Sequence, residues 1–133
     1  MKAKTLNTNK KKEHRITFEL IKKILRTVPQ NEAFYFFTGL GQYSGKYATS
    51  LDCFCNKIKM LEAKSLVFHF KRKDFEKWIE RTIGDAILAN KIGGIEEPVD
   101  GDELRTEIHR IVEQRLSELK KLLASEDVNI KHF

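Results

Sequence analysis

His69 and the polar residues around it are the groups in this sequence whose types could do chemistry. A catalytic histidine needs a nucleophile, an orienting carboxylate or a metal ion within reach. Ser65 lies four residues earlier, about one helical turn away, and the carboxylates of Asp74 and Asp85 could orient the ring. These residues form no recognised catalytic motif, and His69 stands between two phenylalanines. The sequence therefore favours a structural histidine, buried or half-buried, that bonds to the backbone or to Asp74.

A second interpretation is that this region binds a ligand or a partner. The candidate ligand or partner site consists of His69, Asp74, Trp78 and Tyr43. Trp78, taken alone, is most simply a core residue. We assign no catalytic residue, and an enzymatic or small-molecule site around His69 stays a hypothesis.

The cysteines and the other histidines do not predict a metal site. On a helix, Cys53 and Cys55 would point about 200° apart, so they could not bind the same ion. His14, His109 and His132 have no metal-ligand spacing. The sequence thus predicts neither a metal nor another cofactor. Two cysteines without a disulfide framework favour a reducing, cytoplasmic setting.

Three glycines follow the aromatic run "AFYFF". A dinucleotide-binding fingerprint has the spacing G-x-G-x-x-G between a strand and a helix. Gly39, Gly41 and Gly45 are spaced G-x-G-x-x-x-G instead, so they predict a flexible loop anchored by aromatic residues. The aromatic run itself favours a short extended segment.

The positive charge of the chain lies at its N-terminus. The net charge is +6, and the first 30 residues carry nine basic and two acidic side chains. The rest of the chain is close to neutral. This arrangement makes nucleic acid a candidate partner through the basic tail and first helix. The candidate nucleic-acid contacts are Lys10, Lys11, Lys12, Arg15, Lys22, Lys23 and Arg26.

The pattern of apolar residues predicts one helical domain between two tails. We expect a flexible basic tail over residues 1–13, a helical domain over 14–124 and a C-terminal tail over 125–133. The first helix would cover "ITFELIKKILRTV" and end before Pro29.

The middle of the chain predicts a series of short helices. One would begin at Thr49 and Asp52, which are spaced like a capping box. Its apolar face would consist of Leu51, Phe54, Ile58 and Leu61. "AKSLVFHF" predicts the next helix, with a buried strand as the alternative, and "KRK" a polar break. Asp74 would then cap "FEKWIERTI", which ends at Gly84, and Asp85 would cap "AILANKI".

The last helix is expected from Asp102 to about Ala124. Its apolar residues recur at steps of three and four: Leu104, Ile108, Ile111, Val112, Leu116, Leu119 and Leu123. Because this face is long for a domain of 133 residues, a protein partner or a homodimer through this helix is a further expectation.

Three segments of the chain resemble a known family. "YSGKYATSL", "KSLVFHFKRKDFEKWI" and "IGDAILANKI" are similar to sequences of a mainly archaeal family of small helical domains of unknown function. The resemblance covers about residues 34–95. It implies a helical domain and no particular activity. Many relatives have glycine where this chain has Lys73, and the departure weakens the case for a tight turn there.

The sequence predicts a mainly α, single-domain helical bundle with one aromatic, glycine-containing loop or short extended segment. No apolar run approaches the roughly 20 residues that cross a bilayer, and no apolar signal core follows the basic N-terminus. We therefore expect a non-enzymatic binding or scaffolding module in the cytoplasm without membrane contact. The alternatives are the nucleic-acid-associated protein and the site around His69.

Overall fold

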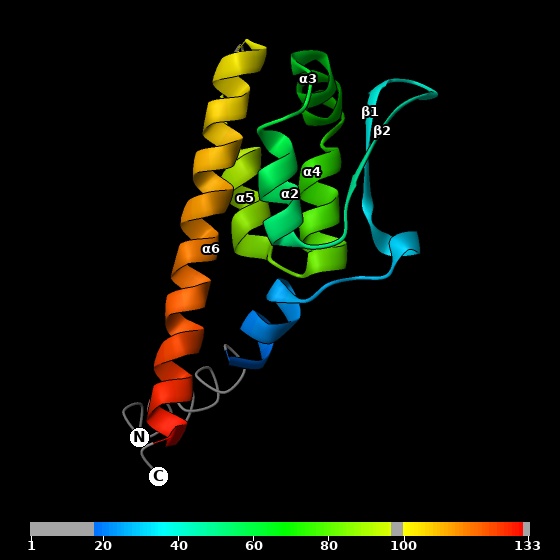
Figure 1. Ribbon diagram of the computed structural model, residues 1–133. Helices are drawn as coiled ribbons and strands as arrows, with labels where there is room; N and C mark the ends of the chain where they lie inside the picture. The colour runs from blue at the N-terminus through cyan, green and yellow to red at the C-terminus, as the bar shows by residue number, and fades with distance from the viewer. Residues whose placement is uncertain (1–17, 97–99, 132–133) are drawn as a thin grey trace, which may run out of the picture.

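The chain folds as a mainly α protein with one two-stranded antiparallel sheet (Figure 1). A computed structural model describes residues 18–96 and 100–131, and it describes side chains up to residue 125. The predicted tail over residues 1–13 lies outside the described residues. So do four of the predicted nucleic-acid contacts: Lys10, Lys11, Lys12 and Arg15.

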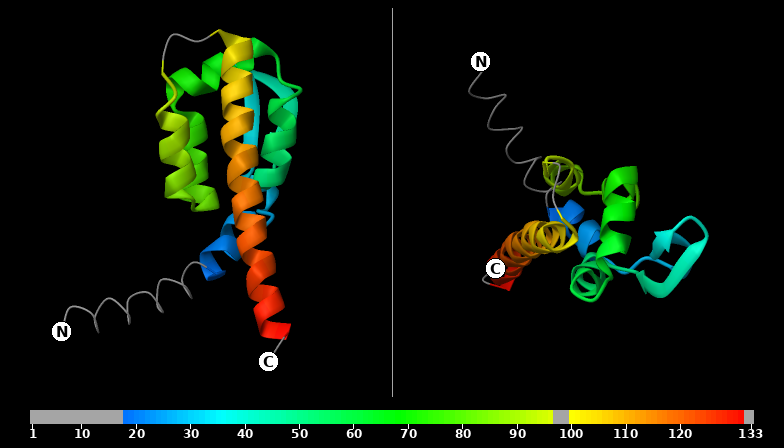
Figure 2. Two further views of the ribbon diagram at one scale, coloured as in Figure 1. Left: turned by 90° about the vertical axis from the view of Figure 1, so that its left-hand side faces the viewer. Right: turned by 90° about the horizontal axis from the view of Figure 1, so that it is seen from above.

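The elements follow one another in a simple order. A helix over residues 18–25 leads to a 3-10 turn (Gln30–Glu32) and a hairpin of β1 (Phe34–Gly39) and β2 (Gln42–Ala48). The helices α2 (Leu51–Ile58), α3 (Ala63–Arg72) and α4 (Asp74–Trp78) come next. A π-helical turn (Ile79–Ile83), α5 (Ala86–Gly93) and α6 (Gly101–Lys131) complete the chain. Figures 1 and 2 show α6 along one side, the hairpin on the other, and the short helices between them.

Aromatic side chains from the hairpin and the short helices form the centre of the core. The Phe34 ring lies 5.3 Å from that of Phe75, and Phe54 stacks on Trp78 at 5.5 Å. Phe36 is fully buried beside them. Such ring pairs add to the apolar area that each side chain buries. The extended segment expected at "AFYFF" is therefore a strand that faces this core.

The long helix α6 covers the core from the other side. Asp100 accepts a hydrogen bond from the Glu103 amide at 2.8 Å, as an N-cap residue does. Six apolar residues of one face are buried: Leu104, Ile108, Ile111, Val112, Leu116 and Leu119. The predicted helix is confirmed, and it continues past residue 124 to Lys131. Its apolar face packs on α2, α3 and α5 within the same chain. The homodimer through α6 stays a prediction.

The three glycines lie in the hairpin, at the end of β1, at the tip and in β2, and not in the predicted flexible loop. Gly41, with a φ of 71°, follows Leu40 at the tip of the hairpin, and Gly45, with a φ of 84°, lies in an irregular part of β2. Both angles lie in the left-handed region that favours glycine. Ser44 donates its hydroxyl to the Phe36 carbonyl across this irregularity. Periodicity missed β2 because its residues are almost all exposed and show no apolar alternation.

Two predicted helix caps are wrong in detail. The Ser50 hydroxyl, and not Thr49, caps α2 by accepting from the Cys53 amide at 3.1 Å. Asp74 begins α4 but makes no capping bond, because its carboxylate is held by other partners. The predicted break "KRK" is shorter in the structure. Only Lys73, whose φ is 62°, interrupts the helices. A tight turn does form there, with lysine in a left-handed conformation.

The other turns follow the prediction. Gly84 has a φ of 95° and ends the π-helical turn, and Asp85 caps α5 by accepting from the Leu88 amide at 3.1 Å. The same Asp85 carboxylate pairs with Arg115 of α6 at 2.8 Å. A salt bridge with one fully buried partner thus joins α5 to α6.

Candidate functional site

His69 fastens the hairpin to α3. Its Nε2 atom accepts a hydrogen bond from the Phe37 amide at 2.8 Å, and its Nδ1 atom lies 2.8 Å from Asp74 Oδ2. Ser65, one turn earlier on α3, donates its hydroxyl to the Phe37 carbonyl at 2.7 Å. We call these four residues, Phe37, Ser65, His69 and Asp74, the hairpin lock. Both backbone polar groups of one strand residue are thereby satisfied by side chains of a helix.

The partners of His69 define its protonation. A backbone N–H can only donate, so Nε2 must be the unprotonated nitrogen, and Nδ1 carries the proton that Asp74 accepts. His69 is 3% exposed, and burial lowers its pKa below the usual 6.5, although the hydrogen bond to Asp74 acts in the opposite direction. The ring is therefore neutral at pH 7. Because both nitrogens are bonded within the protein, neither is free to move a substrate's proton.

Arg72 completes the polar cluster at its outer edge. Its Nε atom donates to Asp74 Oδ2 at 3.0 Å, and the guanidinium lies 5.0 Å from the centre of the Phe68 ring. The Arg72 side chain is half exposed. The outer face of the guanidinium is thus accessible beside an aromatic ring.

A groove of about 360 Å³ runs beside the hairpin lock. Its walls come from β1, the hairpin tip, α3 and the start of α4. The lining residues that matter most here are Tyr35, Phe37, Leu40, Phe68, Arg72 and Asp74. We call this the hairpin groove. It is mainly apolar, with one ion pair at its edge, which is the usual character of a recognition site.

The exposed face of the hairpin, next to this groove, carries a row of tyrosines. Tyr35 stacks on Tyr47 directly across the strands at 5.5 Å, and the Tyr43 ring lies 5.8 Å from Tyr35. Each is more than a third exposed, and Leu40 at the tip is 80% exposed. Desolvation, with the neighbouring Tyr35 and Tyr47, raises the pKa of Tyr43, so the Tyr43 side chain is uncharged at neutral pH. Exposed aromatic rows mark recognition surfaces more often than single exposed residues do.

The four residues of the predicted ligand site lie in three separate places in the structure. His69 and Asp74 touch each other, as predicted. Trp78 lies in the core, where its indole donates to the Glu32 carbonyl at 2.8 Å. Tyr43 belongs to the exposed tyrosine row. The four residues therefore do not line one pocket.

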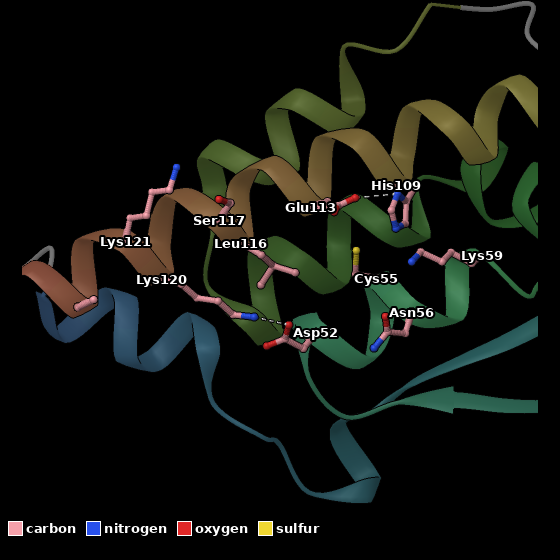
Figure 3. A pocket seen from close by; sticks show the side chains of 11 residues that line it. Asp52, Cys55, Asn56, Lys59, His109, Glu113, Leu116, Ser117, Lys120 and Lys121 are labelled. Atoms are coloured by element: carbon pink, nitrogen blue, oxygen red, sulfur yellow. Dashed lines mark hydrogen bonds and ion pairs between the residues drawn. The ribbon is translucent and has the colours of Figure 1, made fainter.

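A second pocket, of about 510 Å³, lies between α2 and α6 (Figure 3). At one end Lys120 pairs with Asp52 at 2.7 Å, and at the other His109 pairs with Glu113 at 3.2 Å. Cys55 lies in the wall between them, where burial and the nearby Glu113 raise the pKa of its thiol. A raised pKa keeps the thiol protonated, so Cys55 is not an activated nucleophile.

The predicted basic contacts that the structure describes are partly used within the fold. Arg26 donates to the carbonyl oxygens of Lys23 at 2.7 Å and Thr82 at 2.8 Å, and so completes the end of the π-helical turn. The Lys22 amine lies 4.6 Å from the centre of the Phe18 ring. Arg26 therefore stabilises the fold through these bonds. Phosphate binding by Lys22, Lys23 and Arg26 stays a prediction.

Sequence reasoning missed the hairpin side of the site. It did not single out Tyr35, Tyr47, Leu40 or the Phe37 backbone. A two-residue turn at Leu40 and Gly41 could have been expected, but a regular hairpin with that turn would pair Tyr35 with Lys46 and place Tyr43 and Tyr47 on the opposite face. The register shift in the hairpin pairs Tyr35 with Tyr47 instead, and the sequence does not show that irregularity.

Comparison with known proteins gives no relative to draw on. No family model, no curated protein and no solved structure shows significant similarity to the chain. The resemblance to the archaeal family thus stays a prediction. In the part of the chain that the structure describes, no helix is long and apolar enough to cross a bilayer.

Proposed function

We propose that this chain is a cytoplasmic, non-enzymatic binding module, a single helical bundle whose hairpin recognises a partner. The observation that carries the proposal is the fixed hairpin that presents an exposed tyrosine row and an adjoining groove. An isolated two-stranded hairpin is only marginally stable in water. Here His69 and Ser65 fasten the hairpin to α3, and Phe34 and Phe36 anchor it in the core. A preordered surface loses less entropy when it binds.

The same contacts argue against an enzyme. The one histidine with a carboxylate partner in the predicted site uses both ring nitrogens within the fold. The Ser65 hydroxyl donates its proton to the Phe37 carbonyl and is not aligned on His69 as a nucleophile. His69 thus holds the hairpin against α3.

A matched pair of surface variants tests the proposal. Tyr43→Ser removes the most exposed ring of the tyrosine row, and Ile87→Ser removes a somewhat more exposed apolar side chain from α5. Quantitative affinity capture from extracts of the protein's own cells would compare both variants with the wild type. We expect partners that Ile87→Ser retains to fall at least tenfold with Tyr43→Ser. Equal recovery by all three proteins would contradict the proposal.

Nucleic-acid binding through the basic tail remains the rival proposal. A shift assay at two salt concentrations separates the two, because phosphate contacts give an affinity that falls steeply with salt. Salt-sensitive binding that is lost on deletion of residues 1–13 and unaffected by Tyr43→Ser would favour the rival.

A further inference from the structure

We propose that the hairpin groove takes an extended peptide segment of a partner protein, which pairs with the outer edge of β1 at Tyr35. The inference rests on the proposed binding function and names its ligand. The segment would carry one apolar side chain into the groove and an acidic side chain next to it. It would add a short third strand to the hairpin.

The hydrogen bonds of the hairpin show which backbone groups face outward. In an antiparallel pair, alternate residues direct their N–H and C=O toward the neighbouring strand and away from it. The Phe36 carbonyl points toward β2, where Ser44 donates to it. Opposite Tyr35, the Tyr47 carbonyl points away from β1, toward the Cys53 thiol 3.9 Å away. Tyr35 and Tyr47 are therefore a pair without mutual hydrogen bonds, so the Tyr35 N–H and C=O face outward from β1.

The neighbouring outward position on β1 is already occupied. Phe37 gives its N–H to His69 and receives the Ser65 hydroxyl on its carbonyl. Outside the ladder with β2, no group among the described residues bonds to the backbone N–H or C=O of Tyr35. The hairpin lock thus occupies the outward backbone groups of Phe37, whereas those of Tyr35 remain available to a partner. Tyr35 also lines the groove, so the open groups and the cavity coincide.

The groove fits the side chains that such a segment would carry. Its volume of about 360 Å³ is walled by Phe37, Phe68 and Leu40, which suits a leucine, phenylalanine or valine side chain. Leu40 is 80% exposed in the free chain and would be covered by the peptide. Arg72 stands at the rim with its side chain half exposed and only its Nε atom bonded to Asp74. Its remaining N–H groups can take a peptide carboxylate.

The first part of the test uses the free protein. Amide hydrogen exchange followed by NMR should find Phe37 protected by its bond to His69 and Tyr35 exchanging at least tenfold faster. The second part selects ligands for the full chain from a phage library of random heptapeptides. The selected sequences should share an apolar residue beside an acidic one. A synthetic copy of the best binder should slow exchange at Tyr35 at least tenfold, and Arg72→Gln should weaken its binding about tenfold.

The outcomes separate this inference from the proposed function. If no peptide is selected, or if the selected peptides leave exchange at Tyr35 unchanged, the strand-pairing inference is wrong. Binding that leaves Tyr35 unchanged and is abolished by Tyr43→Ser would place the ligand on the tyrosine row, and the proposed function would survive. Binding that is insensitive to both Tyr43→Ser and Arg72→Gln would overturn both proposals. Tyr43→Ser and Ile87→Ser should keep the melting temperature of the wild type, which controls for misfolding.

Discussion

Two buried polar contacts join parts of this protein, and they differ in kind. At the contact between α5 and α6, Asp85 is 2% exposed and bonds to Arg115 through two N–H groups at 2.8 and 3.1 Å. At the hairpin lock, His69 is 3% exposed but neutral, and it bonds to a backbone amide and to Asp74. The first contact balances two charges, whereas the second depends on one ring remaining uncharged. The hairpin is thus held by the contact that pH can weaken.

The largest effect is expected from Arg115→Leu. The variant leaves the Asp85 carboxylate buried, with only its bond to the Leu88 amide. Removing one partner of a buried ion pair costs about 3–5 kcal/mol. Urea denaturation should show a fall in the free energy of unfolding of that order. In the double variant Asp85→Asn/Arg115→Leu part of the loss should be recovered, since asparagine can still cap α5. A loss below about 1 kcal/mol would contradict this expectation, because it would mean that the pair stabilises the fold no more than an exposed salt bridge does.

The next effect is expected from His69→Leu. The variant leaves the Phe37 amide without its partner, and Asp74 keeps only its bond to Arg72. An unsatisfied buried polar group costs about 1–3 kcal/mol, so the free energy of unfolding should fall by that amount. Exchange at the Phe37 amide should accelerate more than exchange within α6. Wild-type stability together with loss of a bound partner would instead make His69 a binding residue.

The pH dependence distinguishes the two contacts directly. Because the folded pKa of His69 is lowered, the unfolded chain binds the proton first as pH falls. The contribution of His69 is then fully present above its unfolded pKa of 6.5 and is lost progressively below it. The loss reaches at most about 1.4 kcal/mol per pH unit. Between pH 7 and pH 5.5 the wild type should lose more stability than His69→Gln in denaturation experiments, since glutamine does not titrate. Parallel curves for the two proteins would contradict this expectation.

The smallest effect concerns the turn that brings Asp74 to His69. Lys73 is exposed and has a φ of 62°, a conformation that disfavours side chains other than glycine. Lys73→Gly should therefore raise the free energy of unfolding by about 0.5–1 kcal/mol. Lys71→Gly, two residues earlier within α3, is the matched control and should lower it by a similar amount. Thermal unfolding of both variants measures the difference, and equal losses would show that the turn is not strained.

Local patterns predicted most helices, and the burial of His69 followed from its apolar neighbours. The helix steps of α6 and the caps at Asp85 and Gly84 are set by nearby residues, so the sequence shows them. The hairpin lock joins Phe37 to residues 28 and 32 positions later, through a backbone amide and carbonyl that any residue would supply. Such a contact leaves no pattern in the spacing of apolar residues along the sequence. Asp74 illustrates the limit, since its place at a helix start predicted a cap while its carboxylate binds His69 and Arg72.

The proposed role of His69 depends most on the protonation of its ring, and long-range proton–nitrogen NMR of the full chain measures that protonation directly. At pH 7 we expect Nδ1 to be protonated and Nε2 not, because Nε2 accepts the hydrogen bond of the Phe37 amide. The ring should keep this state until the pH lies clearly below 6.5, since burial lowers its pKa. Two results would contradict the role of His69 in holding the hairpin against α3. One is a proton on Nε2 at pH 7, and the other is a ring that titrates with an ordinary pKa while the protein stays folded.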